Sequence, residues 1–235
     1  MAEHSVSDGR SGAAAATPTS VQDVPVHAVV DEQAFYARAQ ANASWAASRM
    51  FVAIGATVYG ALVFSYFYLR SLDSNGLWHQ PSQHPPILLS VVMLGLGVTS
   101  SLLFVWATRR LRAGRRGVLD WGVASAITTG VLALTVGLSI WQLSRLPFAP
   151  GDSGYASVFV GTEVVTIGML LIELYQIETV LARSIRLRGV LSPGGDAADS
   201  SEVMAFRLAV DAASLFAGFM AIVLVGVFVL FYWVS

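Results

Sequence analysis

The chain has 235 residues, of which 55% are hydrophobic and 12% are charged, about half the charged share of a soluble domain. This composition excludes an ordinary water-soluble core, because so many apolar side chains would leave large exposed patches. The net charge of −1 excludes a general polyanion-binding protein, and the absence of cysteine excludes disulfides, thiolate metal sites and iron–sulfur clusters within this chain. We therefore expect an integral membrane protein.

Residues 1–46 are expected to form a disordered tail without a secretory signal peptide, because stretches such as "GRSGAAAATPTS" are small and polar. The stretch "DEQAFYARAQANASWAASR", residues 31–49, allows two interpretations. It is either part of this tail or a short helix that lies on the membrane surface. The membrane domain is expected to cover residues 47–235.

Long apolar segments follow the tail, and each reaches the ~20 residues that a helix needs to cross the hydrocarbon. Only helices satisfy the backbone hydrogen bonds of such segments inside a bilayer. The sequence therefore predicts an all-α fold, an integral membrane bundle of five transmembrane helices. The predicted spans are residues 48–69, 86–108, 120–143, 155–182 and 208–233.

The arginines predict the orientation of the spans, because basic loops stay on the cytoplasmic side. Loop 71–85 contains no arginine and link 144–154 contains one, whereas links 109–119 and 183–207 are rich in arginine. The N-terminus is therefore expected in the cytoplasm and the C-terminus outside. The stretch "RRLRAGRR" also fits a nucleic-acid patch, but its place between two spans favours contacts with anionic lipid headgroups, and we expect no nucleic-acid partner. Its arginines are Arg109, Arg110, Arg112, Arg115 and Arg116.

Small residues recur every four positions on the first and last spans, which lets helices approach closely in lipid. The first span carries Ala53, Thr57, Ala61 and Ser65, and the last carries Ala213, Ala217 and Ala221. These strips fit either packing within the bundle or docking onto another membrane protein.

The histidines argue against a redox centre in this chain, because a membrane haem or copper site needs ligands at depth and none lies within a predicted span. We also find no phosphate-cradling glycine-rich loop, nucleophile elbow or zinc-protease motif. No cofactor is expected in this chain. The histidines are His4, His27, His79 and His84.

Carboxylates inside the fourth span are the strongest candidates for chemistry, since burying one in hydrocarbon costs a few kcal/mol. Glu163, close to Thr166, lies ~12 Å from the outer start of this span, and Glu173 lies ~27 Å from it. Either a structural hydrogen-bonding role or proton handling fits these two acids. Nearer the inner surface, Glu178 is expected to pair with Arg183 or Arg186, and Asp211 with Arg207, one helical turn away.

Several weak motifs occur in one order along the chain. "FSYFYLR" closes the first span, an outer loop with "LW" follows, the second span reads "ILLSVVMLGLGVTSSLLF", and "SGYASVF" precedes the fourth. With five spans, this order resembles subunit III of haem–copper terminal oxidases in its short, five-helix bacterial form. The chain departs from that family at Gly55, where a glutamate is common, and at "GTEVVTIGM", where two histidines are common.

The resemblance implies a non-redox subunit III of an aerobic respiratory oxidase in a bacterial cell membrane. Its expected partners are oxidase subunit I, which would hold haem and copper, subunit II and phospholipid. Such a subunit supports proton uptake by the catalytic subunit and transfers no electrons itself. The alternatives are an accessory subunit of a nitric oxide reductase, a small proton or cation transporter that uses Glu163 and Glu173, and a scaffold without its original partner.

Overall fold

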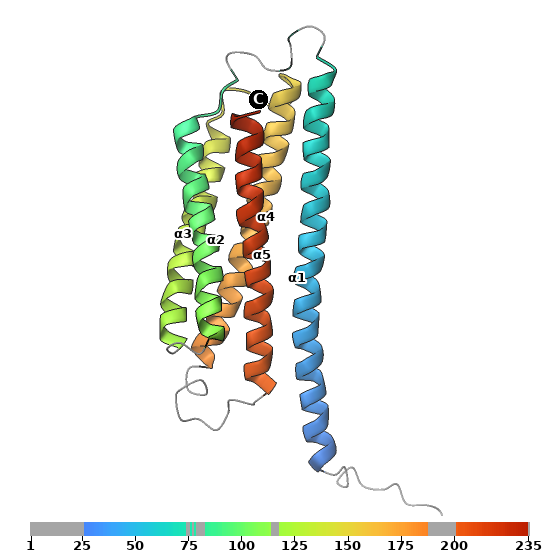
Figure 1. Ribbon diagram of the computed structural model, residues 1–235, viewed down its shortest axis with the longest axis vertical. Coiled ribbons are helices and arrows are strands. Elements are labelled where there is room, and N and C mark those ends of the chain that lie inside the picture. Colours follow the sequence, from blue (N-terminus) through green and yellow to red (C-terminus); the bar gives the residue numbers. More distant parts are fainter. Residues whose placement is uncertain are drawn as a thin grey trace, which may run out of the picture.

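A computed structural model describes residues 26–73, 76, 78, 83–113, 118–187 and 201–234, and within them the chain is helical apart from short connections. Each helix is long and apolar enough to cross a bilayer, which confirms the predicted all-α membrane fold. The helices are α1 (Val26–Ser71), α2 (Ile87–Arg112), α3 (Val118–Ser144), α4 (Gly154–Arg186) and α5 (Ser201–Tyr232) (Figure 1).

The first helix differs from the expectation for the tail. Residues 26–46, which we assigned to a disordered tail, belong to α1, and residues 1–25 lie outside the described part. At 1.5 Å per residue, a 46-residue helix is about 69 Å long, more than twice the hydrocarbon thickness. The N-terminal part of α1 consequently continues past the lower end of the other helices (Figure 1). Neither a free tail nor a separate surface helix describes residues 31–49.

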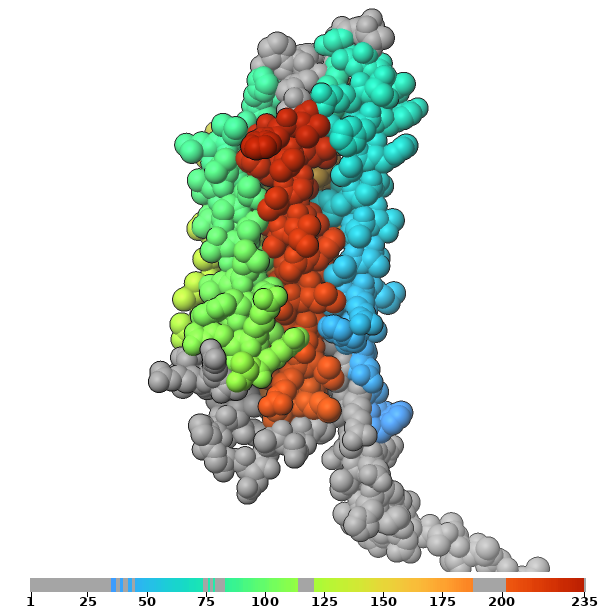
Figure 2. Space-filling model, in the orientation of Figure 1, coloured from blue at the N-terminus to red at the C-terminus, as the bar shows by residue number. Residues whose placement is uncertain are grey.

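Four of the helices form a closed ring. Helix α5 contacts α2, α2 contacts α3, α3 contacts α4, and α4 returns to α5, while α1 packs outside the ring against α4 and α5 only. In the space-filling view α5 lies between α2 and α1 (Figure 2). Because side chains from all four ring helices meet inside the ring, polar groups placed there are separated from lipid.

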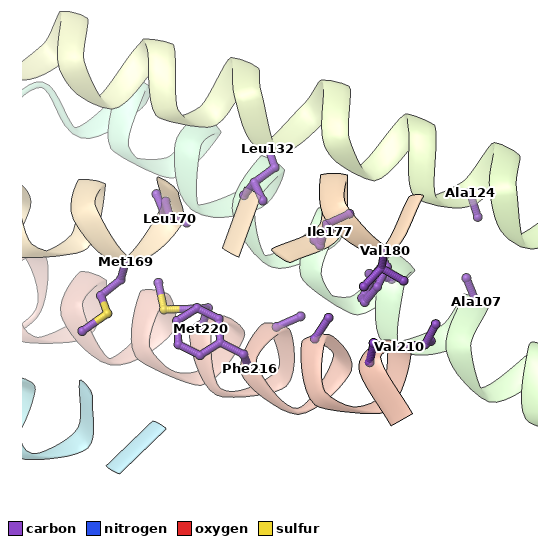
Figure 3. Packing of buried hydrophobic residues seen from close by; sticks show 14 of the residues in the cluster. Ala107, Ala124, Leu132, Met169, Leu170, Ile177, Val180, Val210, Phe216 and Met220 are labelled. Carbon is purple, nitrogen blue, oxygen red and sulfur yellow. The ribbon is translucent and has the colours of Figure 1, made fainter. Parts of the chain in front are cut away.

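Apolar side chains fill the ring on the side where α2 and α4 end. We call this side the arginine-rich end, because it holds Arg109, Arg112, Arg183 and Arg186, and the opposite side the C-terminal end. Figure 3 shows Leu132 of α3, Leu170 and Ile177 of α4, and Phe216 and Met220 of α5 meeting in one cluster. All five side chains are almost completely buried, so the ring has a packed interior here.

Aromatic rings close the C-terminal end. Tyr66 of α1 packs edge-on against Trp78 with ring centroids 5.2 Å apart, and Trp78 packs against Tyr155 of α4 at 6.1 Å. The indole also covers Gly154, where a β-carbon would lie 2.9 Å from the ring. The amide of Tyr155 donates to the carbonyl of Trp78 at 3.2 Å. Phe231 of α5 completes this C-terminal aromatic cluster through edge contacts with Tyr66 and Tyr155.

Arg70 lies at the end of the bundle that the basic loops avoid, and its contact gives a reason for its position. Its guanidinium donates to the backbone carbonyl of Val234, just after α5. The last carbonyls of a helix have no partner within the helix and carry the negative end of its dipole. Arg70 therefore joins the end of α1 to the segment that follows α5, near the negative end of that helix dipole.

Candidate functional site

Two carboxyls of α4, those of Glu163 and Glu173, face the interior of the ring at two levels. Helix α4 begins at Gly154, where the hydroxyl of Ser153 accepts from the amide of Ala156 at 3.0 Å and caps the helix. Glu163 follows about 14 Å along the axis and Glu173 about 28 Å along it. The sequence predicted that both acids lie within this span. Their inward direction follows from the packing of α4 against α3 and α5.

Glu163 lines a small chamber, which we call the Glu163 chamber. Its volume is about 40 Å³, and side chains from all four ring helices line it. A cavity needs about 10–15 Å³ to hold one water molecule, so the chamber has room for a few water-sized groups. The lining residues are Ser90, Met93, Leu94, Thr135, Ser139, Glu163, Thr166, Leu170, Leu224, Val227, Phe228 and Tyr232.

The hydroxyls around the chamber direct their hydrogens away from it. Thr135 donates to the carbonyl of Val131 at 2.9 Å, and Ser139 donates to the carbonyl of Thr135 at 3.0 Å. These are bonds to the preceding helical turn, which satisfy the hydroxyl donor and leave oxygen lone pairs available. The two α3 hydroxyls therefore contribute acceptors to the chamber wall.

Thr166, a predicted site residue, is buried one turn below Glu163. Its hydroxyl donates to the carbonyl of Thr162 at 2.8 Å and accepts from the phenol of Tyr59 at 3.0 Å. Tyr59 belongs to α1, so this bond connects the chamber wall to the helix outside the ring. Residues 107 positions apart make this contact, and nothing in the local pattern of either helix predicts it.

A second polar group lies between the chamber and the C-terminal end of the bundle. Ser90 and Tyr232 share a short hydroxyl contact, and the amide of Gln142 donates to the Ser90 oxygen at 3.1 Å. These residues lie in the terminal turns of α2, α5 and α3. Ser90 and Tyr232 also line the chamber, so polar atoms continue from it towards the C-terminal end of the bundle.

Glu173 occupies a more enclosed position. It is 1% exposed, and its Oε1 atom accepts from the hydroxyl of Ser101 on α2 at 2.8 Å. Its Oε2 atom is buried without a hydrogen-bond partner among the described residues. Leu170 separates Glu173 from the chamber along α4 and is itself 1% exposed. The two carboxyls therefore belong to separate polar sites.

Asp211 pairs with a different arginine from the one that its sequence spacing suggested. We expected Arg207, but a carboxylate oxygen of Asp211 lies 2.5 Å from a guanidinium nitrogen of Arg112. This contact joins α2 to α5 at the arginine-rich end, so it is a tertiary bridge and not a local helical pair. Glu178 also departs from expectation: it is exposed and forms no ion pair with Arg183 or Arg186 among the described residues.

We expect Asp211→Asn to lower the stability of the bundle only slightly, by about 0.2–1 kcal/mol. Both partners are partly exposed, with side-chain exposures of 58% for Arg112 and 26% for Asp211, so solvent screens the pair. Thermal unfolding in detergent at low and high salt measures this effect. A large loss of stability that salt does not reduce would contradict this assignment.

The remaining predicted arginines lie at the arginine-rich end where they are described. Arg109 and Arg110 are exposed, and Arg110 stacks over the ring of Trp106 at 4.7 Å. Arg49 stacks over Trp45 at the same distance on α1. Tryptophan with arginine is typical of the boundary between hydrocarbon and headgroups. Arg115 and Arg116 lie outside the described residues.

No protein-family model matches the chain, and no curated protein matches it significantly.

A cleft separates α1 from the ring near the arginine-rich end. It has a volume of about 320 Å³ and lies between Phe51 of α1, Tyr175 and Arg183 of α4, and Ala212 of α5. A second hollow of about 380 Å³ shares Arg183 and is also lined by Arg186 and Glu202. An apolar cleft thus meets a hollow that carries two guanidinium groups, and we call them together the α1 cleft.

Proposed function

We propose that the chain is a non-redox accessory subunit of a haem–copper terminal oxidase, similar to subunit III. The observation that carries this proposal is the C-terminal aromatic cluster. Tyr66 comes from "FSYFYLR", Trp78 from the "LW" loop and Tyr155 from "SGYASVF", and these three separate motifs of the resemblance meet in one cluster. Because the three aromatic residues pack against one another, a single structural requirement accounts for three motifs that are each weak alone.

A departure from that family also has a structural reason here. At Gly55, where the resemblance expects a glutamate, a β-carbon would lie 2.8 Å from the ring of Phe219 and 3.5 Å from Met169. The contact of α1 with α4 and α5 therefore leaves no space for a longer side chain at position 55. Any role of the family's glutamate does not transfer to this chain.

The outward face of α1 supports a membrane partner. Ala53, Thr57 and Ala61 are exposed, whereas Ala213, Ala217 and Ala221 of α5 are buried within the chain. The small-residue strip of α5 is thus used in the bundle, and that of α1 is left open. A strip of this kind allows a second helix to approach closely, and we assign it to the large catalytic subunit of the oxidase.

The α1 cleft supports phospholipid as a further ligand. An acyl chain fits the apolar space beside Phe51 and Ala212, and the guanidinium groups of Arg183 and Arg186 suit a phosphate headgroup. The basic and apolar parts are adjacent because Arg183 lines both hollows. A lipid held there would fill the space between α1 and the ring.

Affinity purification of the tagged chain from membranes of its native host tests the proposal. We expect a larger multi-span polypeptide that contains haem and copper, in a fixed ratio to this chain, and oxygen consumption by the complex. A colourless preparation would contradict the proposal and favour the transporter, which the two inward-facing carboxyls make the second candidate. Reduction of nitric oxide in place of oxygen would assign the chain to a nitric oxide reductase instead.

The variant Gly60→Leu should release this partner without damage to the chain. Gly60 is exposed beside the small-residue strip of α1, next to Ala61, and no atom lies within 4 Å of a β-carbon built there. A leucine in a close helix contact costs about 1–3 kcal/mol of overpacking, so we expect recovery of the partner to fall about tenfold. Gly137→Leu on α3, where space is equally open, is the matched control. Equal recovery with both variants would place the docking face elsewhere.

A further inference from the structure

We propose that the Glu163 chamber takes up one small monocation, either a sodium ion beside the carboxylate or a proton on the Glu163 carboxyl itself. This site does not depend on the oxidase assignment, since it is built entirely from the four ring helices of this chain. It gives Glu163 a ligand-binding role, as distinct from a purely structural hydrogen bond.

Charge is the first reason for this assignment. None of the residues that line the chamber is basic, so a carboxylate at Glu163 has no cationic side chain beside it there. An uncompensated charge inside a membrane protein is costly. A bound monocation or a proton removes that cost, and a single carboxylate balances one positive charge.

The chemistry of the wall is the second reason. The hydroxyls of Thr135 and Ser139 donate their hydrogens to backbone carbonyls, so their oxygen lone pairs remain available as acceptors. Both residues line the same chamber as Glu163. The rest of the wall is largely apolar, so its oxygen acceptors are few, and together with one carboxylate they suit a hard cation or a strong hydrogen-bond donor. It does not suit an anion, and the volume of about 40 Å³ excludes a large organic cation.

Access to the chamber is the third reason. Glu163 is only partly buried, in contrast to Glu173, which is 1% exposed and held by Ser101. The polar group of Ser90, Gln142 and Tyr232 leads from the chamber to the C-terminal end of the bundle. Glu163 therefore shares open space with other polar side chains, whereas Glu173 is enclosed.

Infrared difference spectroscopy on the full-length protein in lipid membranes tests this proposal, because it separates protonated carboxyl from carboxylate. The signal of Glu163 is the part that Glu163→Gln removes, and Glu173→Gln is the matched control that should leave it intact. Sodium chloride is compared with choline chloride at constant pH and ionic strength, and a pH titration is run without sodium.

Loss of the protonated Glu163 band on addition of sodium at constant pH would identify sodium as the ligand. Loss of that band only when the pH rises would identify the proton. In either case, the double variant Thr135→Val with Ser139→Ala should lower the affinity of the chamber for sodium or for the proton about tenfold, because the bound ion loses two oxygen acceptors. A Glu163 signal that responds to neither sodium nor pH would overturn the proposal. So would a response that the double variant leaves unchanged.

Discussion

Ser101→Ala is expected to destabilise the bundle by about 1–3 kcal/mol, although it removes only one oxygen atom. The hydroxyl of Ser101 is the hydrogen-bond partner of Glu173 among the described residues, and Glu173 is almost completely enclosed. Without it, both carboxyl oxygens are buried without a partner, and the desolvation cost of the acid is no longer offset. Thermal unfolding in detergent measures the loss.

The neighbouring serine provides a matched control for this prediction. Ser100 is equally buried, and both serine hydroxyls lie within hydrogen-bond distance of the Gly97 carbonyl, at 2.8 Å for Ser100 and 3.1 Å for Ser101. Of the two, it is Ser101 that also contacts Glu173, so Ser100→Ala should have little effect. Replacing both members of the pair, as in Ser101→Ala with Glu173→Met, should recover much of the lost stability, because no buried polar group then lacks a partner. Equal losses for Ser100→Ala and Ser101→Ala would show that the bond to Glu173 contributes nothing.

Trp78→Ala is expected to have the largest effect on stability, about 3–5 kcal/mol. The indole contacts Tyr66 and Tyr155 and covers Gly154, so its removal leaves a cavity where α1, α4 and the connecting loop meet. Because this loss affects packing on several elements, the thermal midpoint in detergent should fall by many degrees. The C-terminal end should also become more susceptible to proteolysis.

Two other variants separate packing from a general effect of losing tryptophan. Trp233 is 82% exposed, so Trp233→Ala should leave the thermal midpoint nearly unchanged. Trp78→Phe should cost much less than Trp78→Ala, because it keeps an aromatic ring and removes an indole N–H that has no partner among the described residues. A similar loss for Trp78→Ala and Trp233→Ala would contradict a packing role for the C-terminal aromatic cluster.

The positions of the spans followed from local properties of the sequence. Hydropathy and the ~20-residue length of a crossing are local, and the predicted span 120–143 corresponds closely to α3, Val118–Ser144. The prediction was poorer where the helices leave the hydrocarbon. Helix α5 begins at Ser201, ahead of the predicted start at 208, and α1 begins at Val26. Hydrogen bonds within a helix do not require lipid, so hydropathy cannot define where such a helix begins.

The candidate acids were likewise only half determined by the sequence. Their positions in the fourth span identified Glu163 and Glu173 as unusual, because carboxyls in an apolar run are costly. Their partners could not be identified, since Ser101 lies 72 positions from Glu173 in the chain. Asp211 shows the same limit: the four-residue spacing suggested Arg207, but the contact between α2 and α5 brings Arg112 closer. Ser90 and Ser139 line the chamber, and the weak signal in the sequence that could have identified them is the occurrence of a hydroxyl side chain in an apolar helix.

The sequence by itself determined that this protein is a membrane-spanning helical bundle, because the solvent of each segment follows from the side chains of that segment alone. Only the tertiary structure decided that four helices close into a ring with α1 outside it. It also decided that Glu163 and Glu173 occupy separate interior sites, and that the small-residue strip of α1 stays open. The physical reason is that these features depend on which helix faces contact each other, and helices with similar apolar surfaces can pair in several ways until specific side chains pack together.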